Sequence, residues 1–282
     1  MSEQLGSAPY VIVVGCEKGG TGKSTTSMHL IAYLMQMGAK VGSLDLDARQ
    51  ATLSRYIENR KQTREERGSA LKLPYHLAIL PSQLNDRSEA ESADRDSMAA
   101  AFLQFEEQGL NFVIVDCAGT DSYLVRLAHG RADTLISPVN DSLVDLDVFS
   151  YIDPRDDKKI SPSVYAEMVF ERRKERLRDG GKKIDWVVMR NRLSNFEGNH
   201  KHLMSSVLTK LSKRLMFRLA PGLSERLIYR ELFPLGLTML DIFDMSGQSD
   251  MPRPSLSHVA ARQEIRSLVD SLSLPFPLSD RV

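Results

Sequence analysis

The stretch Lys18-Gly19-Gly20-Thr21-Gly22-Lys23-Ser24-Thr25 decides the fold of this chain. An apolar run at residues 11–14 precedes it, and a helical pattern with Met28, Ile31 and Met35 follows it. A buried strand, a glycine-rich turn and a helix N-terminus make a phosphate cradle, because backbone N–H groups converge there and the helix dipole favours an anion. The stretch therefore predicts nucleotide binding.

Gly-Lys-Ser/Thr at the end of such a turn is the Walker A ending. In this pattern Lys23 reaches the β- and γ-phosphates, and the Ser24 hydroxyl ligates Mg²⁺. The strict pattern has Gly five residues before Gly22, where this chain has Glu17, followed by a second lysine, Lys18. The predicted nucleotide-binding residues of the loop are Glu17, Lys18, Gly19, Gly20, Thr21, Gly22, Lys23, Ser24 and Thr25.

Composition indicates a globular protein without an overall charge bias. The chain has 282 residues, of which 42% are hydrophobic, and its 37 Lys+Arg balance 37 Asp+Glu. Zero net charge argues against a general polyanion binder but leaves room for a local basic face. We expect no signal peptide and no membrane span, because no apolar run approaches the required length. The two cysteines, Cys16 and Cys117, are far apart in sequence and fit a reducing cytoplasm.

Short apolar runs alternate along the chain with helix-length stretches, which include residues 24–37, 48–66, 96–108 and 121–129. The runs lie at residues 11–14, 41–44, 76–80, 112–115, 134–137, 186–189 and 216–219. Most lack alternation of polar and apolar residues, as is typical of strands that are covered on both faces. The pattern predicts an α/β fold with a doubly wound, mainly parallel sheet flanked by helices and ligands at the carboxyl ends of its strands. We expect one domain over residues 1–282, with a charged helical insertion at 155–183 and a C-terminal helical cap at 221–282.

Carboxylates end two of the predicted strands. Asp45 and Asp47 alternate along an extended chain, so both side chains can face one site. We expect Asp47 to orient the attacking water and Asp45 to support the Mg²⁺ shell, although a structural cap remains the alternative for Asp45. Asp116 closes an apolar run as a Walker B carboxylate that holds Mg²⁺, directly or through water; alone this signal is weak, because strands often end on a turn-forming Asp. The predicted metal ligands are thus Ser24, Asp45 and Asp116.

Lys18 has two interpretations. It is either a solvated loop lysine or a charge that meets the nucleotide of a second subunit, as an arginine finger does, because Lys23 already serves the phosphates of its own subunit. On the second interpretation the catalytic residues are Lys18, Lys23 and Asp47.

The lysine that leads this loop resembles the deviant Walker A ATPases, the family of ParA and MinD. In that family the leading lysine contacts nucleotide across a sandwich homodimer that ATP holds together. Asp45-Leu46-Asp47 and residues 116–119 match the family's switch segments. The resemblance implies a P-loop ATPase with ATP and Mg²⁺ as cofactors and a second copy of the chain as a partner.

A closer resemblance, to the MipZ group of division-plane positioning ATPases, covers nearly the whole chain. The matching segments are residues 15–20, 45–50, 128–133, 140–142, 185–188, 190–193 and 229–234. The resemblance implies that Asn191 contacts adenine and that Asp141 and Asp147 line the dimer interface. The chain departs from the pattern at Cys16, where Asn is usual, and at Cys117-Ala118, where Thr-Pro is usual, so that a switch segment loses its proline.

The same resemblance implies ParB, FtsZ and non-specific DNA as partners, and hence a nucleoid-associated protein. The residues support DNA binding independently, since residues 186–218 hold seven basic residues and one acidic residue. The candidates are Arg190, Arg192, Lys210, Lys213, Arg214 and Arg218. Three of them, Lys210, Lys213 and Arg214, share one helical face by their spacing and can neutralise a few phosphates. A solvated basic helix is the alternative.

Other functions on the same fold remain open, namely a ParA-type chromosome-partitioning ATPase or an ATP-coupled ligase. A ligase has no use for Lys18 in trans. A reductase needs solvent-facing cysteines to hold an iron–sulfur cluster, and Cys16 lies inside the loop. A membrane-cycling switch needs a basic amphipathic C-terminal helix, whereas Arg262, Glu264, Arg266 and Asp270 balance in sign, so we expect no membrane binding.

Overall fold

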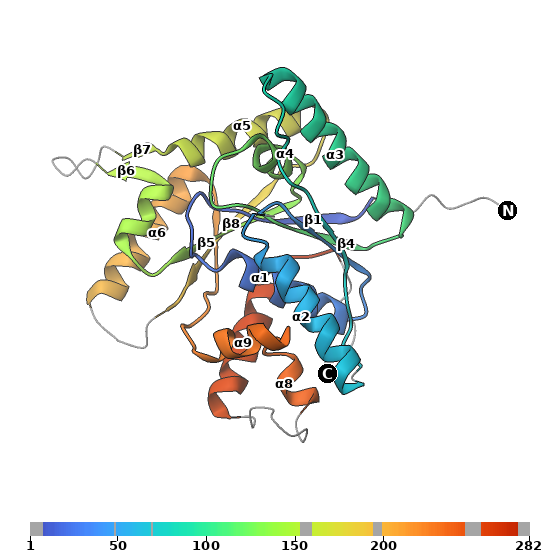
Figure 1. Cartoon of the computed structure of the whole chain (residues 1–282). Helices are drawn as coiled ribbons and strands as arrows, with labels where there is room; N and C mark the ends of the chain where they lie inside the picture. The colour runs from blue at the N-terminus through green and yellow to red at the C-terminus, as the bar shows by residue number, and fades with distance from the viewer. Residues whose placement is uncertain are drawn as a thin grey trace.

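The computed structural model describes residues 8–47, 49–68, 70–152, 160–193, 199–245 and 255–275. Within these ranges, seven strands form one sheet in the order β3-β2-β4-β1-β5-β8-β9, and every neighbouring pair is parallel. This confirms the predicted doubly wound sheet (Figure 1). A separate antiparallel pair, β6 and β7, was not expected from the sequence.

The strands begin and end close to the predicted apolar runs. They are β1 (Tyr10–Val14), β2 (Val41–Asp45), β3 (Tyr75–Ala78), β4 (Phe112–Asp116), β5 (Thr134–Asn140), β6 (Ser150–Ile152), β7 (Ile160–Pro162), β8 (Asp185–Asn191) and β9 (Arg218–Ala220). Every residue of β2 and β4 is buried, as the absence of alternation predicts for strands covered on both faces. The carboxyl ends of β1, β2 and β4 lie side by side, because Val14 pairs with Asp116 and Asp116 with Asp45.

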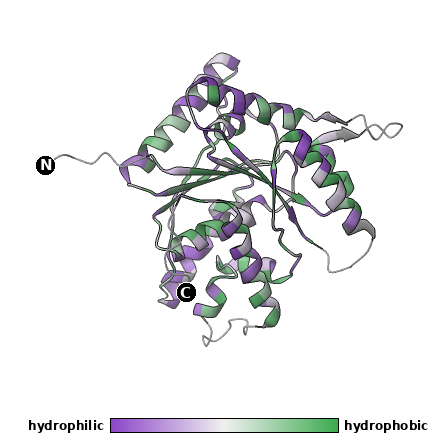
Figure 2. Ribbon diagram, turned by 180° about the vertical axis from the view of Figure 1, so that it is seen from behind, coloured by the Kyte–Doolittle hydropathy of each residue, from purple (hydrophilic) through white to green (hydrophobic). Residues whose placement is uncertain are grey.

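Helices cover both faces of the sheet (Figure 1). They are α1 (Lys23–Gln36), α2 (Thr52–Arg67), α3 (Arg87–Glu107), α4 (Tyr123–Arg131), α5 (Val164–Arg178), α6 (Asn199–Leu215), α7 (Ile228–Leu232), α8 (Asp241–Asp244) and α9 (Leu256–Ser271), with 3₁₀ turns η1 (Leu143–Val148) and η2 (Phe233–Leu235). Figure 2 shows that most helices mix hydrophobic and hydrophilic residues, as helices between a sheet and solvent must. In the described ranges none is long and apolar enough to cross a bilayer.

Two apolar cores lie on opposite faces of the sheet. One joins Val13, Val115 and Trp186 to helices α3 to α6. The other joins Ile12 and Ile114 to α1, α2 and the C-terminal helices. Successive residues of β1 and β4 thus enter different cores, because side chains on a strand alternate between its faces.

Parts of the chain pack differently from expectation. The range 155–183 was expected as an insertion, and its residues 155–159 lie outside the described chain. Its helix α5 buries Tyr165 and Val169 in the first core, so α5 covers the sheet as a crossover helix. Helix α3 begins at Arg87, nine residues before the predicted start at Asp96, because the side chain of Asp86 accepts the Glu89 N–H and caps it.

A buried ion pair ties the C-terminal helices to α2. Arg60 donates from both terminal nitrogens to Asp241, at 2.8 and 2.7 Å, and both side chains are almost fully buried. Although burial raises the pKa of Asp241, the pair with Arg60 and hydrogen bonds from Thr238 to the same carboxylate hold this pKa below its ordinary value. The described part of the range 221–282, which leaves out residues 246–254 and 276–282, therefore packs against the face that carries α1 and α2.

Candidate nucleotide-binding site

The loop between β1 and α1 has the shape of a phosphate cradle. Gly22 caps α1 with a φ of 84°, and Gly20 has a φ of 73°, both in the left-handed region that favours glycine. A Cβ atom at Gly19 or Gly20 would meet nothing within 4 Å, so the loop is open above these residues. At Gly22 a Cβ would lie 2.1 Å from Nδ2 of Asn191. The glycines therefore leave room for a ligand on one side and for Asn191 on the other.

The two lysines of the loop point to different places. Lys23 is buried, and its Nζ donates to the carbonyl oxygen of Lys18 at 2.7 Å, inside the loop. Lys18 forms an ion pair with Asp145 of η1, a residue 127 positions away in sequence. Only Lys23 thus lies within the cradle, while Lys18 lies at its rim.

Asp116 ends β4 beneath the loop. Its side chain is buried and accepts a hydrogen bond from the Ser27 hydroxyl at 3.0 Å. Burial raises the pKa of Asp116 to about 7, and the nearby Asp45 adds to the increase. Because ionisation of Asp116 is unfavourable in this buried place, a cation beside it would stabilise its charged form.

Asp45 is engaged by the protein on both oxygens. Oδ1 accepts the backbone N–H of Asp47 at 2.9 Å, and Oδ2 accepts the backbone N–H and the hydroxyl of Ser54 at 3.0 and 2.7 Å. These contacts hold the start of α2 against the end of β2. The geometry favours the structural cap, and direct metal ligation by Asp45 stays a prediction.

An open cleft of about 610 Å³ lies over the loop. It is lined by Gly19 to Thr25, by Asp47, Arg49, Gln50 and Thr52 from the β2 side, by Ala118, Gly119 and Thr120, and by Arg192. The cleft therefore brings together the loop, the predicted water-orienting Asp47 and the segment that follows Asp116.

Gly22, Thr25, Thr52 and Arg192 line both this cleft and a second cavity of about 390 Å³, which we call the side cavity and which Asn191 also lines. Nδ2 of Asn191 donates to the carbonyl oxygen of Thr21 at 2.7 Å, and its Oδ1 accepts the N–H of Arg192 at 2.9 Å. Arg192 has a φ of 52°, which is uncommon for a residue with a side chain and typical of functional sites. The side cavity is lined by Gly22, Thr25, Thr52, Arg55, Asn191, Arg192, Leu223, Ser224, Glu225, Arg226, Tyr229, Arg230 and Phe233.

The residues present fit Mg-ATP. The cradle accepts phosphates, and the adjoining side cavity is where a nucleoside would extend. Within the described chain, no group of three or more His, Cys, Asp or Glu side chains is placed to hold a metal. A Mg²⁺ beside Ser24 and Asp116 would therefore complete its shell with phosphate oxygens and waters, as Mg²⁺ usually does.

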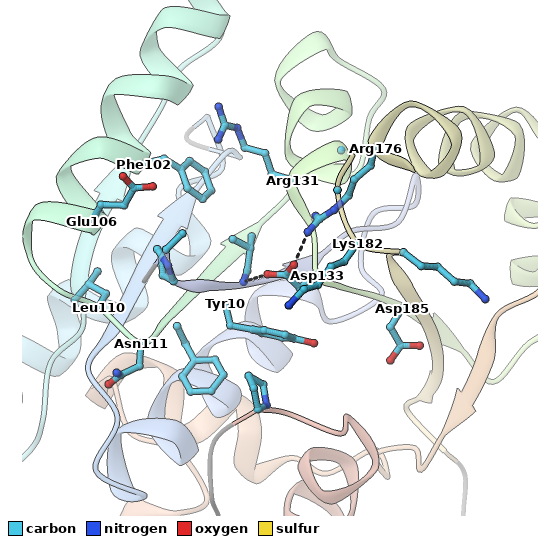
Figure 3. Close-up of a pocket in the computed structure, with 18 of the residues that line it drawn as sticks. Tyr10, Phe102, Glu106, Leu110, Asn111, Arg131, Asp133, Arg176, Lys182 and Asp185 are labelled. Carbon is cyan, nitrogen blue, oxygen red and sulfur yellow. Dashed lines mark hydrogen bonds and ion pairs between the residues drawn. The ribbon is translucent and has the colours of Figure 1, made fainter. Parts of the chain in front are cut away.

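A larger cavity, of about 1010 Å³, lies at the opposite edge of the sheet (Figure 3). It surrounds the first residues of the strands, among them Tyr10 and Asp185. Asp133 accepts the Val11 N–H there at 2.8 Å and pairs with Arg176. Ligands of open parallel sheets bind at the carboxyl ends of strands, whereas this cavity lies at the opposite ends. It is therefore not the nucleotide site, although it is larger than the cleft over the loop.

The six predicted DNA-binding residues do not share one surface role. Arg190 pairs with Asp141, and its Nε lies 3.0 Å from Oδ1. Arg218 forms a bidentate pair with Asp185. Arg192 lines the nucleotide cleft, a location that charge counting missed although Arg192 directly follows Asn191. The remaining three, Lys210, Lys213 and Arg214, are exposed on α6, and we call them the basic face.

Comparison with known proteins identifies the family. The model of the MipZ ATPases matches residues 10–276. The chain belongs to the MipZ family of ATPases. It is thus an ATPase of the class that acts at division or partitioning sites. A comparison with curated protein sequences finds no match.

Solved structures share the fold of this MipZ-family chain. A Cyanothece McdA–ATP complex is 15% identical, with a TM-score of 0.60 over 96% of this chain and 99% of that one. Pyrococcus horikoshii MinD with Mg-ADP is 16% identical, with a TM-score of 0.56 over 97% and 100%. MinD in the MinC:MinD complex of Aquifex aeolicus is 14% identical, with a TM-score of 0.52 over 96% and 98%. At these identities the likeness establishes the fold alone.

Proposed function

We propose that the chain is an ATP-dependent dimerising switch that positions the cell-division plane by regulating FtsZ assembly. Its further partners are ParB and non-specific DNA, and its cofactors are ATP and Mg²⁺. The membership in the MipZ family supports the assignment to division, and the known complexes of McdA with ATP and of MinD with Mg-ADP support the nucleotide.

The proposal of a switch rests on the different positions of the two lysines. Lys23 lies inside the cradle and is placed for the phosphates of its own subunit, whereas Lys18 sits at the rim with its side chain 35% exposed. Once it separates from Asp145, a positive charge at the rim can meet a nucleotide that approaches from outside. Such a charge stabilises phosphoryl transfer when a second molecule brings it, as arginine fingers do.

The cycle uses the residues of the cleft in order. A monomer binds ATP through Gly20, Gly22, Lys23 and Ser24, and two monomers close face to face so that each Lys18 meets the other's phosphates. Asp47 orients a water for attack on the γ-phosphate, and the dimer separates after hydrolysis. Bound Mg²⁺ supplies neutralisation of phosphate charge, and Ser24 and Asp116 would hold it.

Partner surfaces then follow the nucleotide state. The basic face on α6 contributes a few phosphate contacts per monomer, which gives weak and salt-sensitive DNA binding. Dimerisation doubles these contacts, so that retention on DNA depends on ATP. ParB and FtsZ come from the family assignment rather than from a surface of this chain.

The test is the mass of Asp47→Ala in solution, measured by light scattering with Mg-ATP and with Mg-ADP. The proposal expects a dimer with ATP and a monomer with ADP, and a monomer in both when Lys18→Ala is added. Lys18→Ala should still bind ATP, because Lys23 is untouched. A chain that binds ATP but stays monomeric would instead favour the ATP-coupled ligase.

A further inference from the structure

The side cavity is bordered by a loop that does not line the cleft over the cradle. Leu223, Ser224 and Arg226 line it from the segment between β9 and α7. Two polar atoms of its lining, Nε of Arg226 and Oη of Tyr229, are buried without a hydrogen-bond partner among the described residues. Buried donors without protein partners are costly, so these two atoms are placed to bond a polar group that enters the cavity.

Glu264 of α9 holds this loop from outside the cavity. Its Oε2 accepts the backbone N–H of Ser224 at 3.0 Å, and its Oε1 accepts the Ser224 hydroxyl at 2.8 Å and Nη2 of Arg226 at 2.6 Å. Arg226 also donates from Nη1 to the Ser257 hydroxyl of α9, at 2.7 Å. A carboxylate that accepts three hydrogen bonds, one of them from a guanidinium, fixes the loop more firmly than neutral pairs would.

The same loop is paired with the strand end that carries Asn191. Leu223 donates its N–H to Arg190 and accepts the N–H of Leu193, both at 3.0 Å, and Glu225 donates to Leu193 at 3.1 Å. The loop therefore sits between α9 on one side and the end of β8 on the other. A shift of the loop changes the cavity wall that faces Asn191.

We propose that Glu264 is a positioning residue for the nucleoside half of the ATP site. Glu264 does not line the cavity, so it acts through Ser224 and Arg226. The inference rests on the proposed binding of ATP, with the phosphates in the cradle and the nucleoside in the side cavity. Leu223, Ser224 and Arg226 line the side cavity and not the cleft over the cradle, so Glu264 tunes the affinity for the nucleoside and leaves the affinity for the phosphates unchanged.

The experiment compares two ligands by calorimetry, Mg-ATP and Mg-tripolyphosphate, on full-length protein. Glu264→Ala should weaken the affinity for ATP about tenfold, which corresponds to the loss of one set of charge-assisted hydrogen bonds. It should change the affinity for tripolyphosphate by less than about twofold. Glu264→Gln keeps an acceptor for Ser224 and should recover most of the loss. Gln263→Ala, an exposed neighbour on α9, is the matched control and should bind both ligands as the parent does.

Turnover gives a second readout that loss of stability would not imitate. Glu264→Ala should raise the KM for ATP about tenfold with kcat unchanged. Equal weakening of both ligands, or unchanged ATP affinity in a folded Glu264→Ala, would overturn the inference. If Glu264→Ala does not fold, an unaltered ratio of the two affinities in Arg226→Gln, which removes the guanidinium that Glu264 holds, would overturn it. A parent protein that binds neither ligand would instead refute the proposed ATP binding.

Discussion

The ion pair between Lys18 and Asp145 makes a specific prediction about dimerisation. If Lys18 serves the nucleotide of a partner subunit, it must first leave Asp145, and that separation opposes the dimer. Asp145 is 10% exposed and Lys18 is 35% exposed, so the pair is partly desolvated and worth more than an average surface pair. We take roughly 1 kcal/mol for each subunit, at the top of the range for exposed pairs.

Asp145→Asn removes this opposition in both subunits of a dimer. The sum is about 2 kcal/mol, which corresponds to about a 30-fold lower dimer dissociation constant. The measurement is sedimentation equilibrium with a non-hydrolysable ATP analogue and Mg²⁺, which separates dimer affinity from turnover. Without nucleotide the variant should remain a monomer, because freeing Lys18 creates no new contact.

Asp147→Asn is the matched control, because it removes the same charge from an exposed position of the same 3₁₀ turn, which the resemblance places at the same interface, without freeing Lys18. An equal gain in both variants would mean that reduced negative charge of this face, rather than release of Lys18, drives association. A weaker dimer in Asp145→Asn would mean that Asp145 is itself needed in the dimer. Either result would refute the reasoning.

Three further predictions concern stability and DNA. Burial lowers the pKa of both His29 and His129 to about 4, so the unfolded chain takes up more protons below pH 6.5 and stability should fall from pH 6.5 towards pH 4. The loss of unfolding free energy reaches about 3 kcal/mol for each histidine. In His129→Gln, urea titrations at several pH values should show a weaker dependence of this free energy on pH. Arg60→Met leaves Asp241 buried without its ion-pair partner and should lower the free energy of unfolding by about 3–5 kcal/mol. Arg60→Met combined with Asp241→Leu should lower it much less. Equal melting temperatures for the two variants would contradict this. Replacing the basic face with Glu should reduce the salt slope of ATP-dependent DNA retention by up to about 3 for each subunit, and an unchanged slope would clear that face.

The sheet and the cradle were predictable because their signals are local. A strand buried on both faces needs a continuous apolar run, and such runs lie at every strand of the sheet, with boundaries displaced by a few residues. The glycines at 20 and 22 are required by backbone angles that few other residues adopt. The hairpin β6–β7 was not predicted because its strands are short, and the early start of α3 was not predicted because it depends on a single cap at Asp86.

The contacts that decide what each charge does were not predictable in the same way. Counting basic residues placed Arg190 and Arg192 with a DNA-binding surface, but the pairing of β8 with β5 brings Arg190 to Asp141. Likewise the partner of Lys18 is set by the fold over a long sequence separation. Sequence gives the inventory of charges, whereas tertiary pairing determines which of them remain available.

Asp45 illustrates why the same residue supports two interpretations until the fold is known. A carboxylate at the end of β2 can face a metal or accept the N–H groups of the next turn, and both uses need the same residue type at the same place. Here Ser54 and the backbone of Asp47 occupy its oxygens, and His76 hydrogen-bonds the Ser54 hydroxyl in turn, at 3.0 Å. Asp45 therefore holds Asp47 at the cleft, so Asp45→Asn should lower turnover by displacing Asp47, while direct metal ligation by Asp45 stays a prediction.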